Sequence, residues 1–344
     1  MALLSAVPVR SPTSPLHYQP GINNLRAIAA LGVCLFHYFT GLLPEREHVA
    51  FTKHLFVRGY LGIDIFFVIS GFIIPYSLLR QNYQLTDFGT YLKHRLIRIN
   101  PPAYAAMLLV LAQWTFIDTF AKSDHAYLGS VSVPRLLHNF LFTIPFTRYE
   151  WLVGACWTLA TELQFYLFLG LLFSLLFAPQ RSVWWFVGGY LLLSIGYQAN
   201  VATTITFLTN APLFALGGTC VLWQQQRLSA LGFGALLFVF TALTYWQLDW
   251  MAAAVGLLTA GAILTVRTAV PGLSAIGKIS YSLYLTHMLV GRMTEFLLIR
   301  IIAPTSDIRR TLIVCLCLGA ALGVAALFYL WVERPFVQLA KRVR

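Results

Sequence analysis

The sequence predicts an all-α protein, a polytopic membrane helical bundle of about ten transmembrane helices. Two observations carry this prediction. Of 344 residues, 58% are hydrophobic and only 10% are charged, whereas an ordinary soluble domain has about 25% charged residues. The apolar residues also gather into runs of about 16 to 25 residues, the length that a helix needs to cross a hydrocarbon core roughly 30 Å thick.

Ten such runs follow one another along the chain, and each predicts one spanning helix. The third begins at Pro101 and Pro102, residues that favour the first turn of a helix. Residues 135–146 are too short to span and predict an interfacial or re-entrant segment. The ten predicted spans are residues 22–43, 59–80, 101–121, 152–177, 183–199, 205–224, 229–246, 250–266, 279–302 and 311–333.

We expect one membrane domain over residues 1–344, because no internal repeat or long linker divides the chain. Residues 1–21 are expected to form a cytoplasmic tail, since their apolar run is too short for a signal peptide. No appended soluble domain is expected. Gly319 and Gly323 form a G-x-x-x-G pattern, which predicts close contact between two helices.

The positive charges indicate orientation. The two tails and the even-numbered loops hold thirteen Lys and Arg residues, and the odd-numbered loops hold nine. The positive-inside rule therefore predicts that both termini are cytoplasmic. The net charge of +12 is spread over short loops with no basic block, which argues against a nucleic-acid partner. The five cysteines form no C-x-x-C pair, so no metal site is predicted.

Ionisable groups inside spans are costly, so each one suggests a function. His37, Asp64 and Glu162 fall inside predicted spans at depths that would allow them to meet around one cavity. A carboxylate that orients an imidazole is a common acid–base arrangement, and these three residues are the predicted catalytic group. A structural role remains the alternative for each: a carbonyl-bonded histidine for His37, and a pairing within the bundle for Asp64.

Three arginines suggest a second, anionic site. Arg26 and His37 are eleven residues apart, which on an α-helix places them on one face about 16 Å apart. Arg95 and Arg98 project from one helical face at the expected cytoplasmic edge. Two guanidinium groups suit a phosphorylated ligand, although arginines at this edge can also serve topology alone.

Six segments occur together in a known order. They are Arg26 with His37 after ten intervening residues, FFVISGF, Arg95-x-x-Arg98 with INPPAY, WTLATELQFY around Glu162, SYSLYLTH ending at His287, and WVERPF. With them the chain resembles the acyltransferase-3 family of integral-membrane acyltransferases, which O-acylate sugars of cell-surface and exported glycans. The matching segments extend from residue 23 to residue 336.

This resemblance implies a multi-pass protein of the bacterial cytoplasmic membrane that has membrane lipids around it and no bound cofactor. It implies acyl-CoA, often acetyl-CoA, as donor and a saccharide hydroxyl as acceptor, as in lipopolysaccharide or exopolysaccharide. Arg26 and His37 match the family's essential arginine and histidine, and Arg95 and Arg98 match its arginine pair.

His37 is then the expected base, and both direct transfer and an acyl-histidine intermediate remain open. Trp157, Tyr166 and His287 are weaker candidates for acceptor binding, because aromatic side chains stack on sugars but also pack in membranes. The rival reading is a proton-coupled transporter or a flippase of a glycan substrate, which would also bury His, Asp and Glu. No inverted repeat in the sequence supports that reading.

Overall fold

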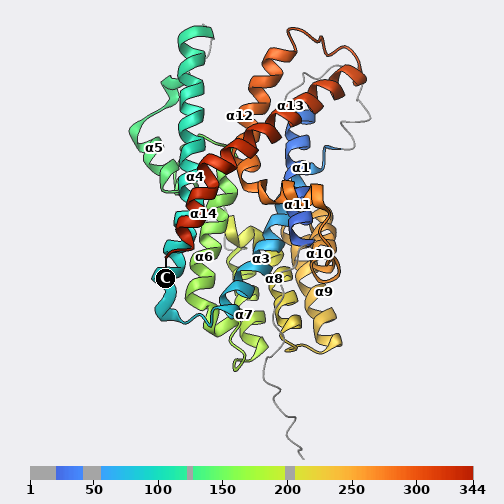
Figure 1. Ribbon diagram of the computed structural model, residues 1–344. Coiled ribbons are helices and arrows are strands. Elements are labelled where there is room, and N and C mark those ends of the chain that lie inside the picture. The colour runs from blue at the N-terminus through green and yellow to red at the C-terminus, as the bar shows by residue number, and fades with distance from the viewer. Residues whose placement is uncertain (1–20, 42–55, 122–126, 198–205, 344) are drawn as a thin grey trace, which may run out of the picture.

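The computed structural model describes residues 21–41, 56–121, 127–197 and 206–343. All regular elements in these ranges are helical (Figure 1), which confirms the all-α prediction. The predicted tail, residues 1–21, lies outside the described residues apart from Gly21. The α-helices are α1 (Gly21–Gly41), α3 (Gly62–Arg80), α4 (Phe88–Phe116), α5 (Val133–Phe140), α6 (Cys156–Leu176), α7 (Val183–Gly196), α8 (Thr206–Gln224), α9 (Ala230–Gln247), α10 (Trp250–Thr265), α11 (Pro271–Lys278), α12 (Ser280–Leu298), α13 (Asp307–Phe328) and α14 (Arg334–Ala340).

Within the described residues, seven helical segments are long and apolar enough to cross a membrane. They contain α1, α3, α4, α6, α8 and α9, and the continuous stretch from α13 to α14. The predicted spans 183–199 and 250–266 correspond to α7 and α10, which are apolar but shorter. The predicted span 279–302 corresponds to α12, which is outside the seven. The count of about ten spans and the cytoplasmic termini therefore stay predictions.

The predicted start of the third span at Pro101 is wrong. Helix α4 begins at Phe88, after a turn in which the backbone N–H of Gln84 donates to Asp87 (2.9 Å), and both prolines lie inside the helix. Proline removes helical N–H groups, but neighbouring helices can satisfy the carbonyls that are freed in a membrane. The carbonyls that lose their i→i−4 donors to Pro101 and Pro102 are those of Ile97 and Arg98. The next carbonyl along the chain, that of Ile99, accepts a hydrogen bond from the Tyr281 hydroxyl of α12 (2.8 Å).

The segment predicted to be too short to span is short in the structure. Helix α5 has eight residues, and Ser132 caps it by accepting a hydrogen bond from the backbone N–H of Arg135 (3.3 Å). In Figure 1 it lies beside the C-terminal half of α4, where the Tyr104 hydroxyl donates to the Phe140 carbonyl (2.8 Å).

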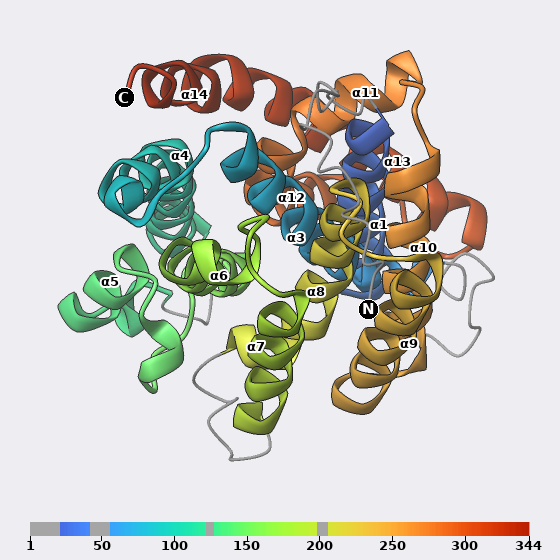
Figure 2. The same ribbon diagram turned by 90° about the horizontal axis from the view of Figure 1, so that it is seen from below.

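Helix α3 is central to the bundle, with α1, α6, α8 and α12 around it (Figure 2). Glycines allow this close packing. A Cβ on Gly71 would overlap the carbonyl oxygen of Phe214, and one on Gly217 would overlap that of Val68, so α3 and α8 touch backbone to backbone. Gly319 and Gly323, by contrast, have no atom of the described residues within 4 Å of an added Cβ. The predicted helix contact at this pair is therefore not found within the described part of the chain.

Candidate functional site

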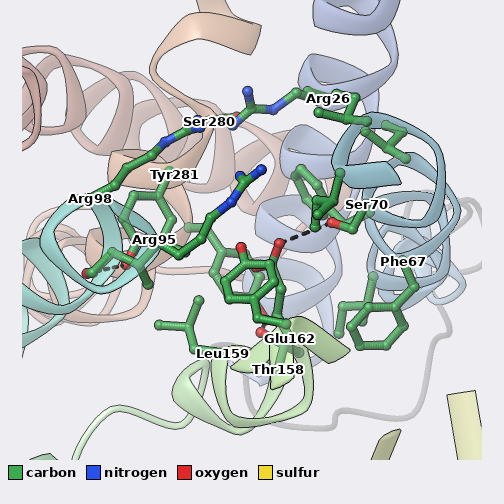
Figure 3. A pocket seen from close by; sticks show the side chains of 18 of the residues that line it. Arg26, Phe67, Ser70, Arg95, Arg98, Thr158, Leu159, Glu162, Ser280 and Tyr281 are labelled. Atoms are coloured by element: carbon green, nitrogen blue, oxygen red, sulfur yellow. Dashed lines mark hydrogen bonds between the residues drawn. The ribbon is translucent and has the colours of Figure 1, made fainter. Parts of the chain in front are cut away.

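A cavity of about 140 Å³ opens between α1, α3, α4, α6, α12 and the π-helical turn η7 (Tyr329–Glu333) that follows α13. Its lining combines two kinds of side chain. The charged side chains Arg26, Arg95, Arg98, Glu162 and Glu333 line the part that we call the arginine end; apolar side chains of α3, among them Ile63, Phe66, Phe67 and Ile73, line much of the rest. Figure 3 shows Arg26, Arg95 and Arg98 extending from different sides toward the same space.

Arg95 is the most buried of the three arginines, with 8% of its surface exposed. Its guanidinium lies between two aromatic rings, 5.7 Å from the centre of Tyr91 and 5.4 Å from that of Tyr166. Such cation–π contacts hold the charge in place, but the Nε of Arg95 has no hydrogen-bond partner among the described residues. A buried guanidinium with an unused donor is suited to an anionic ligand.

Arg98 and Arg26 line the cavity beside Arg95, as the one-face spacing of Arg95 and Arg98 predicts. Their acidic neighbour is Glu333, whose carboxylate is held by Ser282: the backbone N–H donates at 3.2 Å and the hydroxyl at 2.5 Å. The described charged residues that line the cavity are three arginines and two carboxylates, Glu162 and Glu333, so the arginine end keeps a formal net charge of +1.

Glu162 belongs to this arginine end. Its carboxylate accepts a hydrogen bond from the Ser70 hydroxyl (3.0 Å), and it lines the cavity together with Tyr166, Arg95 and Arg98. His37 and Asp64, both described, are not among the residues that line this cavity.

Asp64 is also separated from His37. A Cβ on Gly62 would overlap the Ala29 carbonyl, and one on Gly59 would overlap the Gly32 carbonyl, which sets the antiparallel register of α1 and α3. In this register Asp64 lies level with residue 27, so about ten residues, or roughly 15 Å of helix rise, separate it from His37.

The structure therefore does not bring His37, Asp64 and Glu162 around one cavity, and that part of the sequence prediction is corrected. The prediction estimated the depth of each residue from its position within a straight predicted span. The actual depth and direction of each side chain depend on the register that the glycine contacts set between helices. Their catalytic roles stay predictions.

His37 lies beside His287. The two ring centroids are 5.2 Å apart. His287 is fully buried, and its Nδ1 lies 2.7 Å from the Tyr284 carbonyl, so this nitrogen carries the proton and donates. The Nε2 of His287 is buried and has no hydrogen-bond partner among the described residues.

Two of the three weaker candidates for acceptor binding, His287 and Tyr166, are buried, and Trp157 is half-buried. His287 is enclosed, and Tyr166 is 4% exposed in the arginine end of the cavity. Trp157 packs edge-on against Phe67, with ring centroids 6.3 Å apart. Burial thus places His287 and Tyr166 among the interior groups, and their proposed sugar contacts stay untested.

Two site residues, Ser70 and Glu333, were not singled out from the sequence. Both lie inside segments that carried the family resemblance, FFVISGF and WVERPF. The signal was therefore present as a motif, but only the fold shows that these two segments border the same cavity.

Comparisons with known proteins identify the family of the chain. A family model described as an acyltransferase domain matches residues 19–330. A provisionally named O-acetyltransferase of Staphylococcus aureus strain MSSA476 is 27% identical over 332 residues, covering 80% of this chain and 51% of that protein. The O-acetyltransferase OatA of S. aureus strain NCTC 8325 is 28% identical over 178 residues, covering 48% of this chain and 27% of OatA.

This chain thus spans about half the length of the first of these relatives. No solved structure matches it. Because the family model covers residues 19–330, including every cavity arginine and both histidines of the facing pair, the chain belongs to the acyltransferase-3 family of acyltransferases.

Proposed function

We propose that this protein is a membrane-bound O-acetyltransferase that moves an acetyl group from cytoplasmic acetyl-CoA to a hydroxyl of a cell-surface or exported saccharide. The observation that carries the proposal is the meeting of Arg26, Arg95 and Arg98 at one end of a cavity whose remaining walls are largely apolar. The phosphates of a CoA thioester suit the arginines, and its long pantetheine arm suits the less polar interior.

The reactive end of the donor is assigned to His37. On α1 it lies eleven residues beyond Arg26, about 16 Å along the helix. Tyr284 connects the two regions, because its side chain lines the cavity while its carbonyl holds His287, the neighbour of His37. A donor anchored by its phosphates at the arginines would extend past Tyr284 and present its thioester near His37.

The chemistry follows from these positions. A thioester is already activated, whereas a sugar hydroxyl is a weak nucleophile at neutral pH and benefits from a base. His37 accepts the hydroxyl proton while the oxygen attacks the thioester carbonyl. The C–S bond then breaks, the ester remains on the sugar, and the CoA sulfur leaves as a thiol after taking up the proton from His37.

The location follows the same reasoning. The seven long apolar helical segments suit a multi-pass membrane protein, and the donor requires the arginine end to face the cytoplasm. Gln81, exposed in the loop after α3, should then react as Gln81→Cys with an impermeant maleimide only from the cytoplasmic side. The exposed Arg148, in the loop before α6, should react as Arg148→Cys only from outside.

The deciding experiment uses the detergent-purified protein, acetyl-CoA, and oligosaccharides from hydrolysed bacterial surface polysaccharide. We expect release of free CoA that depends on the oligosaccharide, and a matching mass increase of one acetyl group on the sugar. Oligosaccharide counterflow in proteoliposomes without CoA release would instead support a transporter and overturn the proposal.

A further inference from the structure

The buried pair of histidines has a feature that the proposed reaction does not yet use. His287 is fully buried on α12, and its Nε2 has no hydrogen-bond partner in the part of the chain that the structure describes. An unpaired buried polar atom is destabilising, so its presence points to a partner that forms during function.

The tautomer of His287 is set by its own helix. Its Nδ1 lies 2.7 Å from the Tyr284 carbonyl, which can only accept, so Nδ1 carries the hydrogen. In a neutral imidazole the other nitrogen then has a lone pair and no proton. Nε2 is therefore an acceptor, and because Nδ1 points back at α12, Nε2 points away from that backbone.

Three described aromatic rings surround His287, and two of them are engaged elsewhere. The Tyr38 hydroxyl donates to the His287 carbonyl (2.8 Å), and the Tyr284 hydroxyl lies 2.9 Å from the Thr158 hydroxyl. The third ring is His37, whose centroid at 5.2 Å is closer than those of Tyr38 at 6.5 Å and Tyr284 at 5.8 Å. Of the three described rings, His37 is therefore the one whose N–H is free to meet the Nε2 lone pair.

We propose that His287 is the positioning residue of His37: its Nε2 accepts a hydrogen bond from one ring nitrogen of His37, so that the other nitrogen keeps its lone pair for the acceptor hydroxyl. This inference rests on the proposed function. In free enzymes such bonds are often long and shorten when the substrate arrives. A carboxylate plays this orienting part in many acid–base pairs; here a neutral imidazole takes its place.

Two amide substitutions separate this role from a purely structural one. In His287→Asn the side-chain amide can replace Nδ1 and keep the bond to the Tyr284 carbonyl, but nothing replaces Nε2. In His287→Gln the longer side chain places an amide oxygen near the Nε2 position, where it can accept from His37. If His287 positions His37, the kcat of His287→Gln should be higher than that of His287→Asn. If His287 has only a structural role, the kcat of His287→Asn should be the higher of the two.

The measurement is the kcat and the KM for acetyl-CoA in the acceptor-dependent CoA-release assay. For His287→Asn we expect kcat to fall roughly ten- to a hundredfold, with KM changed by no more than about twofold. This fall in kcat lies between the effect of losing one hydrogen bond and the effect of losing a general base. His287→Gln should recover at least half of that loss on a logarithmic scale. Thr286→Val, which removes only a bond within α12 to the Ser282 carbonyl, is the matched control and should keep the wild-type kcat.

The outcomes are distinguishable. A wild-type protein that releases no CoA overturns the proposed function, and this inference with it. An active wild type with a normal kcat in His287→Asn, or a lower kcat in Gln than in Asn, overturns the inference alone. Size-exclusion profiles and melting temperatures in detergent show whether a variant fails to fold. If His287→Asn fails to fold, His287→Gln is compared with the wild type instead. A change in KM without a change in kcat in that comparison would also refute the positioning role.

Discussion

Ser70 on α3 donates a hydrogen bond of 3.0 Å to Glu162 on α6, across 92 residues of sequence. The bond joins two of the segments that carry the family resemblance, FFVISGF and WTLATELQFY. Both residues line the cavity next to Arg95 and Arg98. Ser70 thus holds a carboxylate at the edge of a cationic site and limits how fully that carboxylate can pair with the arginines.

Removing this restraint should weaken donor binding. In Ser70→Ala the freed Glu162 can turn toward the guanidinium groups and compete with the CoA phosphates. A hydrogen bond to a charged group is worth about 1.5–3 kcal/mol, so we expect the half-saturating acetyl-CoA concentration to rise about tenfold. The double variant Ser70→Ala, Glu162→Gln should regain donor affinity, because the competing charge is gone. A double variant no better than Ser70→Ala would contradict this reading.

The arginine pair should distinguish a ligand site from a topology signal. Arg95→Lys and Arg98→Lys keep the positive charge but lose the planar fork that binds phosphate in two places. We expect each to need roughly ten- to a hundredfold more acetyl-CoA for half-maximal rate, with the acceptor dependence unchanged. Arg80→Lys, at the end of α3 and exposed, serves as the membrane-edge control. If all three variants need the same acetyl-CoA concentration for half-maximal rate, Arg95 and Arg98 act only as topology signals.

Loss of the proposed base should abolish turnover without loss of fold. His37 is half-buried on α1 and makes no hydrogen bond on which that helix depends among the described contacts. Because a positioned base contributes about 10²–10⁴-fold, His37→Ala should lower kcat by at least a hundredfold and keep its acetyl-CoA affinity. His138→Ala on α5, outside the residues that line the cavity, should stay active. Near-normal turnover of His37→Ala would exclude it as the base.

The glycine contacts make a prediction about stability. Gly217→Ala forces a methyl group onto the Val68 carbonyl at the crossing of α3 and α8, and overpacking of this kind typically costs about 1–3 kcal/mol. Thermal unfolding in detergent should show a lower melting temperature. Gly319→Ala adds its methyl group to open space and should leave the melting temperature unchanged or slightly higher, since alanine favours helix. A larger fall in melting temperature for Gly319→Ala than for Gly217→Ala would contradict this account of the helix contacts.

The sequence by itself determined that the helices are suited to a lipid bilayer, and it determined much of their length. A hydrocarbon core requires long apolar runs, whichever helices pack beside them. It also determined the spacing of Arg95 and Arg98, since residues three apart share a helical face. The motif order gave the family. These properties are local, so a linear pattern is sufficient to predict them.

Only the tertiary structure decided which helices meet, and at what register. In a bundle surrounded by lipid, apolar residues face both the core and the membrane, so periodicity does not reveal the partner of a helix. Backbone contacts at Gly59 and Gly62 set the register that separates Asp64 from His37. The same packing joins Glu162 to Ser70 and places His287 beside His37.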